Sequence, residues 1–160
     1  MKALYITNFG LLDNLGQTQI LPYLEGLSKK GIKVYVLSFE KWHNLNNRPC
    51  VENVEKRLKG LGIEWDRLIY HRRWGNLWDV LAGSLKALKI TIAEDISILH
   101  ARATIPVLIA WPIAKILRRK IIYDRRGTMA GDFVDDVNKE NIFSIMLFSF
   151  IVNSIDRFIM

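Results

Sequence analysis

Short apolar segments alternate with helical patterns along the whole sequence, and this alternation limits the chain to few folds. Apolar runs typical of buried strands occur at 3–8, 33–39, 63–71, 96–100 and 120–124, and another begins at 156–160. Between them, apolar residues recur at helical spacing, which predicts helices at 17–30, 49–60, 77–93, 105–118 and 139–153. Helices that join successive strands in this way require parallel pairing and right-handed crossovers. The sequence therefore predicts a doubly wound, mostly parallel Rossmann-like α/β sheet with helices on both faces.

Size and composition are those of one globular domain. The 160 residues, half of them hydrophobic, can build a core without disulfides. Cys50 is the single cysteine, which excludes an intramolecular disulfide framework and a multi-cysteine metal site. The net charge of +7 comes in small groups such as Arg118–Lys120. These groups are either solvated helix ends and loops or a means of attracting anions, and no nucleic-acid motif accompanies them.

The apolar segments are too short to cross a membrane. The longest, Ile142–Val152, has about 11 residues where a spanning helix needs about 20. A buried helix is the first interpretation of this segment, and a helix lying in a membrane interface is the second. No signal peptide precedes the first strand. We expect a cytoplasmic protein, with peripheral contact to the inner membrane face as a further hypothesis.

Polar residues follow the first predicted strand, where ligands of parallel α/β sheets bind. Gly16, Gln17 and Thr18 stand at the beginning of the next helix. Free N–H groups at a helix start, with a glycine that allows close approach, suit a phosphate. The alternative is that Gly16 only makes the turn.

Two further loops carry groups suited to anions or hydroxyls. His100 ends the fourth predicted strand, and it is either a satisfied structural residue or a hydrogen-bonding and proton-transfer group. Arg102 follows and could bind a phosphate with two hydrogen bonds. After the fifth strand come Asp124, Arg126 and Gly127, where the carboxylate either caps the loop or orients the arginine. We expect these loops to converge on one ligand.

Other polar and aromatic residues give weaker indications of a ligand site. Neither GxGxxG nor a P-loop occurs, so Glu40 is interpreted as a surface or loop-ordering residue and not as a ribose ligand. His43 and His71 have no acidic or cysteine partner at metal-ligand spacing and are expected to be exposed. The tryptophans are expected mostly to fill or cover the core: Trp42, Trp65, Trp74, Trp78 and Trp111. The alternative for Trp74 and Trp78, which flank Gly75, is that they line an apolar groove for an acceptor.

Three stretches resemble the amino-terminal domain of family 4 (group 1) glycosyltransferases of the GT-B fold. They are GQTQILPYLEGLSKKGIKVYVLSFEK at 16–41, ILHARATIPVLIA at 98–110 and KIIYDRRGTMAGDF at 120–133. The specific parts are a G-x-[ST]-Q stretch that opens a helix, an H-A-R segment after a strand and a D-x-R-G segment after the next strand. The resemblance covers essentially the whole chain, with two departures, Leu15 in place of a glycine and Arg125 in place of an apolar residue.

The resemblance implies that 1–160 is the acceptor-side half of a two-domain enzyme whose nucleotide-sugar domain is absent from this chain. Such enzymes transfer a hexosyl group with retention and without a metal or other cofactor, and half of one would be inactive alone. The loop at Gly16 would then approach the donor diphosphate, together with Asp124, Arg126 and Gly127. His100 would lie near the transferred sugar, and Arg102 is the rival for that place.

The partners that the resemblance implies are a nucleotide-sugar donor, a sugar or lipid-linked acceptor and the protein's own carboxyl-terminal domain. The alternative from another class is a stand-alone α/β module that binds a nucleotide or phosphorylated ligand at the same edge without catalysis. A second α/β domain with a Glu-x7-Glu pattern in the same gene would distinguish the two.

Overall fold

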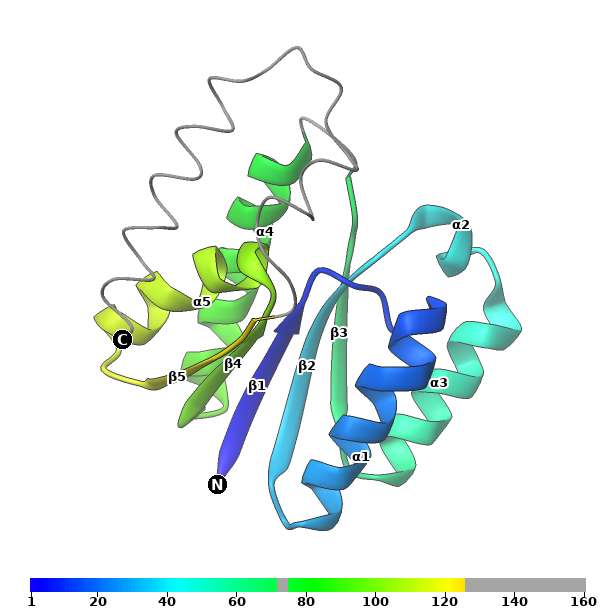
Figure 1. Cartoon of the computed structure of the whole chain (residues 1–160), viewed down its shortest axis with the longest axis horizontal. Helices are drawn as coiled ribbons and strands as arrows, with labels where there is room; N and C mark the ends of the chain where they lie inside the picture. Colours follow the sequence, from blue (N-terminus) through cyan, green and yellow to red (C-terminus); the bar gives the residue numbers. More distant parts are fainter. Residues whose placement is uncertain (72–74, 126–160) are drawn as a thin grey trace. The chain divides into compact units, whose positions relative to one another are not determined.

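The computed structural model describes residues 1–71 and 75–125 (Figure 1). Residues 1–124 form one compact unit. The strands and helices follow one another as β1 (Lys2–Thr7), the π-helical turn η1 (Gly16–Ile20), α1 (Leu21–Lys29), β2 (Lys33–Glu40), α2 (Trp42–Leu45), α3 (Arg48–Gly60), β3 (Glu64–Ile69), α4 (Gly75–Ala93), β4 (Ile98–Arg102), α5 (Thr104–Ile116) and β5 (Lys120–Asp124).

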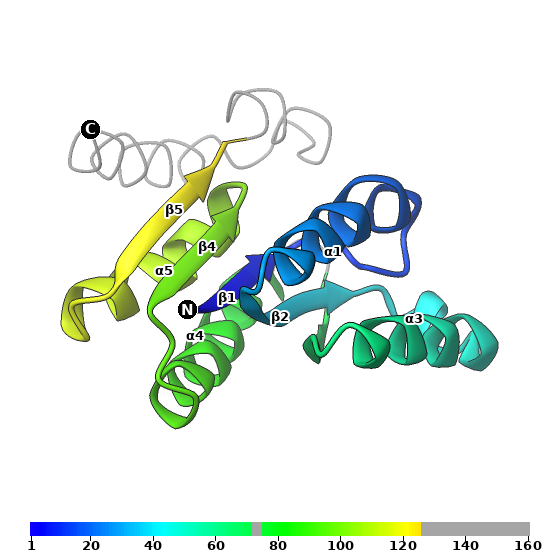
Figure 2. The ribbon, with the colours of Figure 1, turned by 90° about the horizontal axis from the view of Figure 1, so that it is seen from below.

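The sheet has the order β3-β2-β1-β4-β5, and all of its neighbouring strands are parallel. From β1 the chain builds outward through β2 to β3, and it then returns to add β4 on the other side of β1. Helices α1 and α3 cover one face, and α4 and α5 cover the other (Figures 1 and 2). The predicted doubly wound Rossmann-like fold is confirmed.

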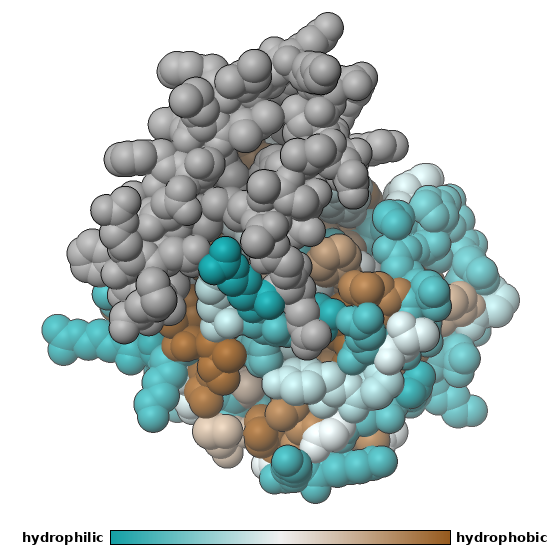
Figure 3. Space-filling model, in the orientation of Figure 1, coloured by the Kyte–Doolittle hydropathy of each residue, from teal (hydrophilic) through white to brown (hydrophobic). Residues whose placement is uncertain are grey.

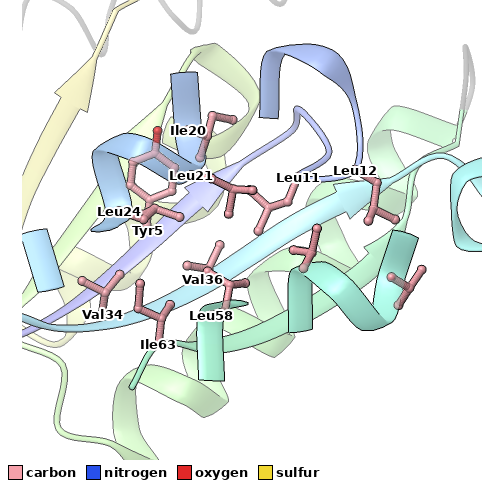
Figure 4. Packing of buried hydrophobic residues seen from close by; sticks show 12 residues of the cluster. Tyr5, Leu11, Leu12, Ile20, Leu21, Leu24, Val34, Val36, Leu58 and Ile63 are labelled. Atoms are coloured by element: carbon pink, nitrogen blue, oxygen red, sulfur yellow. The ribbon is translucent and has the colours of Figure 1, made fainter. Parts of the chain in front are cut away.

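The core on the α1 and α3 side is an aliphatic cluster (Figure 4). Leu21 and Leu24 of α1 are completely buried, and Leu58 of α3 is nearly so. They pack with Val34 and Val36, which alternate along β2 as a pleated strand requires. On the other side, residues of opposite parity such as Leu37 are equally buried. The sheet is therefore buried on both faces, as parallel sheets generally are.

Strand β4 lies two residues later in the sequence than predicted. The apolar Ile96 is fully buried, but Asp95 before it has a positive φ of 48° and the strand begins only at Ile98. As a result His100 lies in the middle of the strand, and Arg102 is its last residue. Arg102, which was expected in a loop, is thereby fixed by the sheet.

Helix α4 is apolar on more than one side. Three of its large apolar residues at helical spacing are largely exposed, with Leu81 51%, Leu85 64% and Ile92 61% accessible. Its buried residues are instead Asp79, Gly83, Ala87, Ile90 and Thr91. Small residues at the contact allow the helix to approach the sheet closely, and the larger leucines are left outside.

Two exposed tryptophans also differ from expectation. Trp42 is 63% and Trp78 is 61% accessible, whereas Trp65 is partly buried against the core cluster as predicted. Trp74 lies outside the described residues, as do Arg126, Gly127, the helix predicted at 139–153 and the strand predicted at 156–160. Among the helices of the described ranges, none is long and apolar enough to cross a membrane.

Several charged groups are solvated at helix ends and loops, which was one of the two interpretations of the basic groups. The region of α2 and α3 is hydrophilic on its outer surface (Figure 3). At the amino end of β5, Lys120 is exposed, and the guanidinium of Arg119 lies 2.7 Å from the carboxylate of Asp95. Lys29 and Lys30, at the end of α1, are also exposed.

The different environments of two leucines make a direct test of α4. Leu85→Ala should lower the free energy of unfolding by less than about 0.5 kcal/mol, because the side chain is mostly in water. Leu24→Ala removes the same atoms from a completely buried site and should cost about 2–5 kcal/mol. Urea denaturation of the two variants measures the difference. Equal losses would show that α4 buries its leucine face after all.

Candidate functional site

The candidate site lies at the carboxyl ends of β1 and β4, where the strand order reverses. Loops leave these two strands toward opposite sides, and ligands bind at this position in many doubly wound folds. Thr7 ends β1 directly opposite Arg102 of β4, and Asp124 ends β5 on the other side of Arg102. His100 is paired with Tyr5 two residues below this edge.

Arg102 is a buried cation with mostly neutral partners. Only 2% of the residue is accessible. Its Nη2 donates to Oε1 of Gln19 at 2.8 Å, and its Nη1 lies 3.5 Å from the hydroxyl of Tyr5. The nearest carboxylate oxygen in an ion pair is that of Asp124, at 3.8 Å, and Nε has no hydrogen-bond partner among the described residues. Because burying a charge is costly unless it is well paired, this arrangement favours an anion as an additional partner.

His100 is held in an aromatic cluster beneath Arg102. Its ring meets the edge of Tyr5 with 4.7 Å between ring centroids, and the hydroxyl of Tyr23 lies 3.4 Å from Nδ1. The residue is 6% accessible. Burial raises the pKa of Tyr5, with Arg102 acting in the opposite direction, so its hydroxyl remains protonated at neutral pH. The sequence predicted His100 and Arg102, and the structure adds Tyr5, Gln19 and Tyr23, which have no sequence signal.

The segment around Gly16 is already helical where the phosphate site was predicted to begin. Helical backbone starts at Asn14, and the Gln17 N–H donates to the carbonyl of Asp13. The Gln17 side chain donates to the carbonyl of Leu11 at 2.7 Å. The hydroxyl of Thr18 donates back to the carbonyl of Asn14. These groups stabilise the loop itself.

Gly16 is required by packing inside this loop. A Cβ at this position would lie 2.6 Å from the Cα of Leu11 and would also collide with the carbonyl oxygen of Gly10. The turn alone therefore explains why a glycine is needed at position 16, and contact of Gly16 with a phosphate stays a prediction. The turn still contributes to the site, because Gln19 of η1 binds Arg102.

Glu40 holds the loop after β1 in place. It is fully buried and ends β2, and its carboxylate accepts hydrogen bonds from Leu11 N at 2.7 Å and Leu12 N at 3.3 Å. A third bond comes from the hydroxyl of Ser38 at 2.6 Å. Gly10 has no side chain to collide with this carboxylate. The surface interpretation of Glu40 is wrong, and the loop-ordering interpretation is confirmed.

Burial makes the Glu40 interaction depend on pH. Desolvation raises the pKa of Glu40 above its ordinary value of 4.5, although the hydrogen bonds oppose this. The folded state therefore binds the proton of the Glu40 carboxyl more tightly than the unfolded state does. The free energy that this proton contributes to folding is lost as pH rises from about 4.5 through the raised pKa. Glu40→Gln removes the titration. We expect its stability relative to the wild type to improve as pH rises from 4.5 to 8.

Urea denaturation across that pH range measures the effect. At low pH Glu40→Gln is expected to be close to the wild type, because the protonated carboxyl, like the amide, has only one oxygen without a hydrogen. Glu52→Gln is the matched control, since Glu52 is exposed on α3, and it should leave the pH dependence unchanged. A stability deficit of Glu40→Gln that grows with pH would contradict this account.

The predicted site residues thus divide into three groups. The structure brings His100, Arg102 and Asp124 together at one edge. It places Gly16, Gln17 and Thr18 in the adjoining turn, mainly in structural bonds. Arg126 and Gly127 lie outside the described residues. Within 1–71 and 75–125 there is no group of three or more His, Cys, Asp or Glu residues able to hold a metal ion.

Comparison with known proteins shows similarity in structure only. No protein-family model matches the sequence, and no curated protein matches it. A glycosyltransferase from Rickettsia africae ESF-5 has a TM-score of 0.51 and 13% identity, over 76% of this chain and 28% of that chain. A protein described as a UDP-N-acetylglucosamine 2-epimerase from Listeria monocytogenes has a TM-score of 0.51 and 12% identity, over 76% and 30% of the two chains.

The S. aureus protein MnaA, solved with UDP, has a TM-score of 0.53 and 11% identity, over 87% of this chain and 34% of that chain. The present chain therefore spans about a third of the length of these proteins or less. At such identities the similarity concerns the fold, and it supports the Rossmann-like assignment independently of the sequence.

Proposed function

We propose that this chain is the acceptor-side domain of a nucleotide-sugar-dependent glycosyltransferase, and that it forms one wall of the cleft in which transfer occurs. The observation that carries the proposal is the buried Arg102 at the point where the strand order reverses. A nucleotide sugar carries a diphosphate, and a guanidinium held in a fixed place is suited to bind it.

The start of α5 adds to the attraction for an anion. Arg102 is followed by Ala103, which precedes the first turn of α5 and provides no side-chain cap. The N–H groups of this first turn therefore have no capping acceptor from Ala103, and they carry the positive end of the helix dipole. Ala103 has φ 73° and ψ 179°, a conformation that is strained for any residue with a Cβ. Such strain is often found at functional sites.

The chemistry follows from the charge that develops when a sugar–phosphate bond breaks. Negative charge grows on the departing diphosphate, and a cation already in place stabilises it without reorganisation. Arg102 is assigned this role. His100, next to it on the same strand face, is assigned to the transferred sugar, where it would orient a hydroxyl.

The finer features of the proposal come from the family 4 resemblance. They are transfer with retention, a hexosyl donor, a glycan or lipid-linked acceptor, action without a metal, peripheral membrane contact and a separate domain that binds most of the nucleotide. The similarity to the R. africae glycosyltransferase and to the UDP-bound S. aureus protein supports the general class. The L. monocytogenes protein has the same fold, so a sugar-nucleotide epimerase is the nearest rival.

Binding of UDP to this chain tests the role of Arg102. Because most of the nucleotide site is assigned to another domain, we expect weak binding, with Kd of about 1 mM or higher. Arg102→Met should weaken it about tenfold, the loss of a charged hydrogen bond. The measurement is a titration followed by ¹H–¹⁵N correlation spectra of the labelled chain.

Arg119→Met is the matched control. It removes the same charge from the opposite edge of the sheet, where Arg119 pairs with Asp95. We expect it to bind UDP like the wild type, with an unchanged spectrum elsewhere. Submicromolar binding by the wild type would contradict the assignment of most of the nucleotide site to another domain. The same affinity in both variants would remove Arg102 from the proposed site.

A further inference from the structure

A second candidate site, which is concave, lies at the carboxyl end of β3 and the beginning of α4. It is a depression of about 320 Å³, lined by Arg67, Leu68, Ile69, His71, Trp78, Asp79 and Ala82. In the sheet order, β2 and β1 lie between β3 and β4, so the end of β3 is three strand spacings, roughly 14 Å, from Arg102 along the same edge. The proposed function uses none of these residues.

His71 is held at this depression by a buried carboxylate. Asp79 is 3% accessible, and its Oδ1 lies 2.6 Å from Nδ1 of His71. Its other oxygen, Oδ2, accepts the backbone N–H of His71 at 2.8 Å. Both carboxylate oxygens thus fix one histidine, whose side chain remains 47% accessible. His71 was expected to be exposed, which is correct, but its acidic partner eight residues away was not foreseen.

The bond to Asp79 determines what the rest of the ring can do. With its proton at Nδ1 directed to the carboxylate, the neutral imidazole keeps an acceptor lone pair at Nε2. Nε2 has no hydrogen-bond partner among the residues that the structure describes. A histidine oriented in this way is suited to accept a hydrogen bond from a ligand hydroxyl.

The remaining lining is neutral or apolar. Leu68, Ile69 and Ala82 contribute hydrocarbon, and the indole of Trp78 is 61% accessible. Among the described lining residues the one cation is Arg67, which is stacked over Trp65 and paired with Glu55 at 2.5 Å. Because its charge is already compensated, the depression is poorly suited to a phosphate.

We infer that this depression binds a neutral pyranoside ring. One face of such a ring presents C–H groups, which pack on an exposed aromatic surface such as Trp78, and its edge presents hydroxyls for Nε2 of His71. Apolar lining with a few fixed polar groups is the usual composition of a small-molecule site. Asp79 is a positioning residue, which acts through His71.

In the proposed transferase this site would hold part of the acceptor, and this assignment rests on the proposed function. Its distance from Arg102 exceeds the width of one sugar ring, so the ring bound here would be a neighbour of the unit that receives the new sugar. The acceptor would then be an oligosaccharide that extends along the sheet edge. Binding of a pyranoside at the depression does not itself require transfer.

Methyl glycosides test the site without knowledge of the natural acceptor. The labelled chain is titrated to about 50 mM, the range of weak single-ring binding, with methyl glucoside, galactoside, mannoside and N-acetylglucosaminide. We expect at least one of them to shift the indole signal of Trp78 and the amide of His71 in a saturable way. Trp78→Ala and His71→Ala should each weaken this binding about tenfold or more.

Trp42→Ala is the matched control, because Trp42 is equally exposed at 63% but lies in α2, outside the lining. It should bind the glycoside like the wild type. Asp79→Asn should also weaken binding while Trp78 remains in place. A purely structural role of the His71–Asp79 pair predicts lower stability with no glycoside response.

Absence of saturable shifts with all four glycosides would overturn the inference, and so would equal binding by Trp78→Ala and Trp42→Ala. Preferential binding of inorganic phosphate at these residues would overturn it as well. Arg102→Met should retain glycoside binding. Failure of the UDP experiment and failure of this one are therefore distinguishable.

Discussion

The parallel pairing of β1 with strands on both sides is the constraint on which the site depends. Because β2 and β4 both run in the direction of β1, the carboxyl ends of all three meet at one edge. The chain leaves β1 toward one side and β4 toward the other, so neither of these two connections crosses the gap between the strands. Residues 83 positions apart in the sequence, Gln19 and Arg102, bind each other there.

Two buried charges flank β1 at this edge, and their environments differ. Glu40 of β2 accepts hydrogen bonds from two backbone N–H groups and from the hydroxyl of Ser38. The backbone bonds hold the loop after β1 in place. Arg102 of β4 has a neutral acceptor in Gln19 and a more distant carboxylate in Asp124. A buried charge is stable only with adequate partners. The first charge is satisfied within the fold, and the proposed function assigns an anionic ligand to the second.

The sequence predicts the fold well because alternating strand and helix periodicities leave few parallel topologies. It fails where burial depends on distant partners. Ile96 extends the apparent strand although Asp95 turns the chain, and α4 is apolar on more than one side, so its periodicity cannot select the buried one. The bonds of Glu40 to Leu11 and Leu12 span 29 and 28 residues, respectively, and have no local signature. The positions of Arg102 and Asp124 were predictable because strand ends mark the carboxyl edge of the sheet, whereas His100 lies two residues before that edge; their contact with a ligand stays a prediction.

A crystal structure of the chain grown with millimolar UDP tests the central claim most directly. The account predicts the diphosphate at the carboxyl ends of β1 and β4, within hydrogen-bond distance of the Arg102 guanidinium. Nucleotide bound at another surface, with Arg102 still contacting only Gln19, Tyr5 and Asp124, would contradict it.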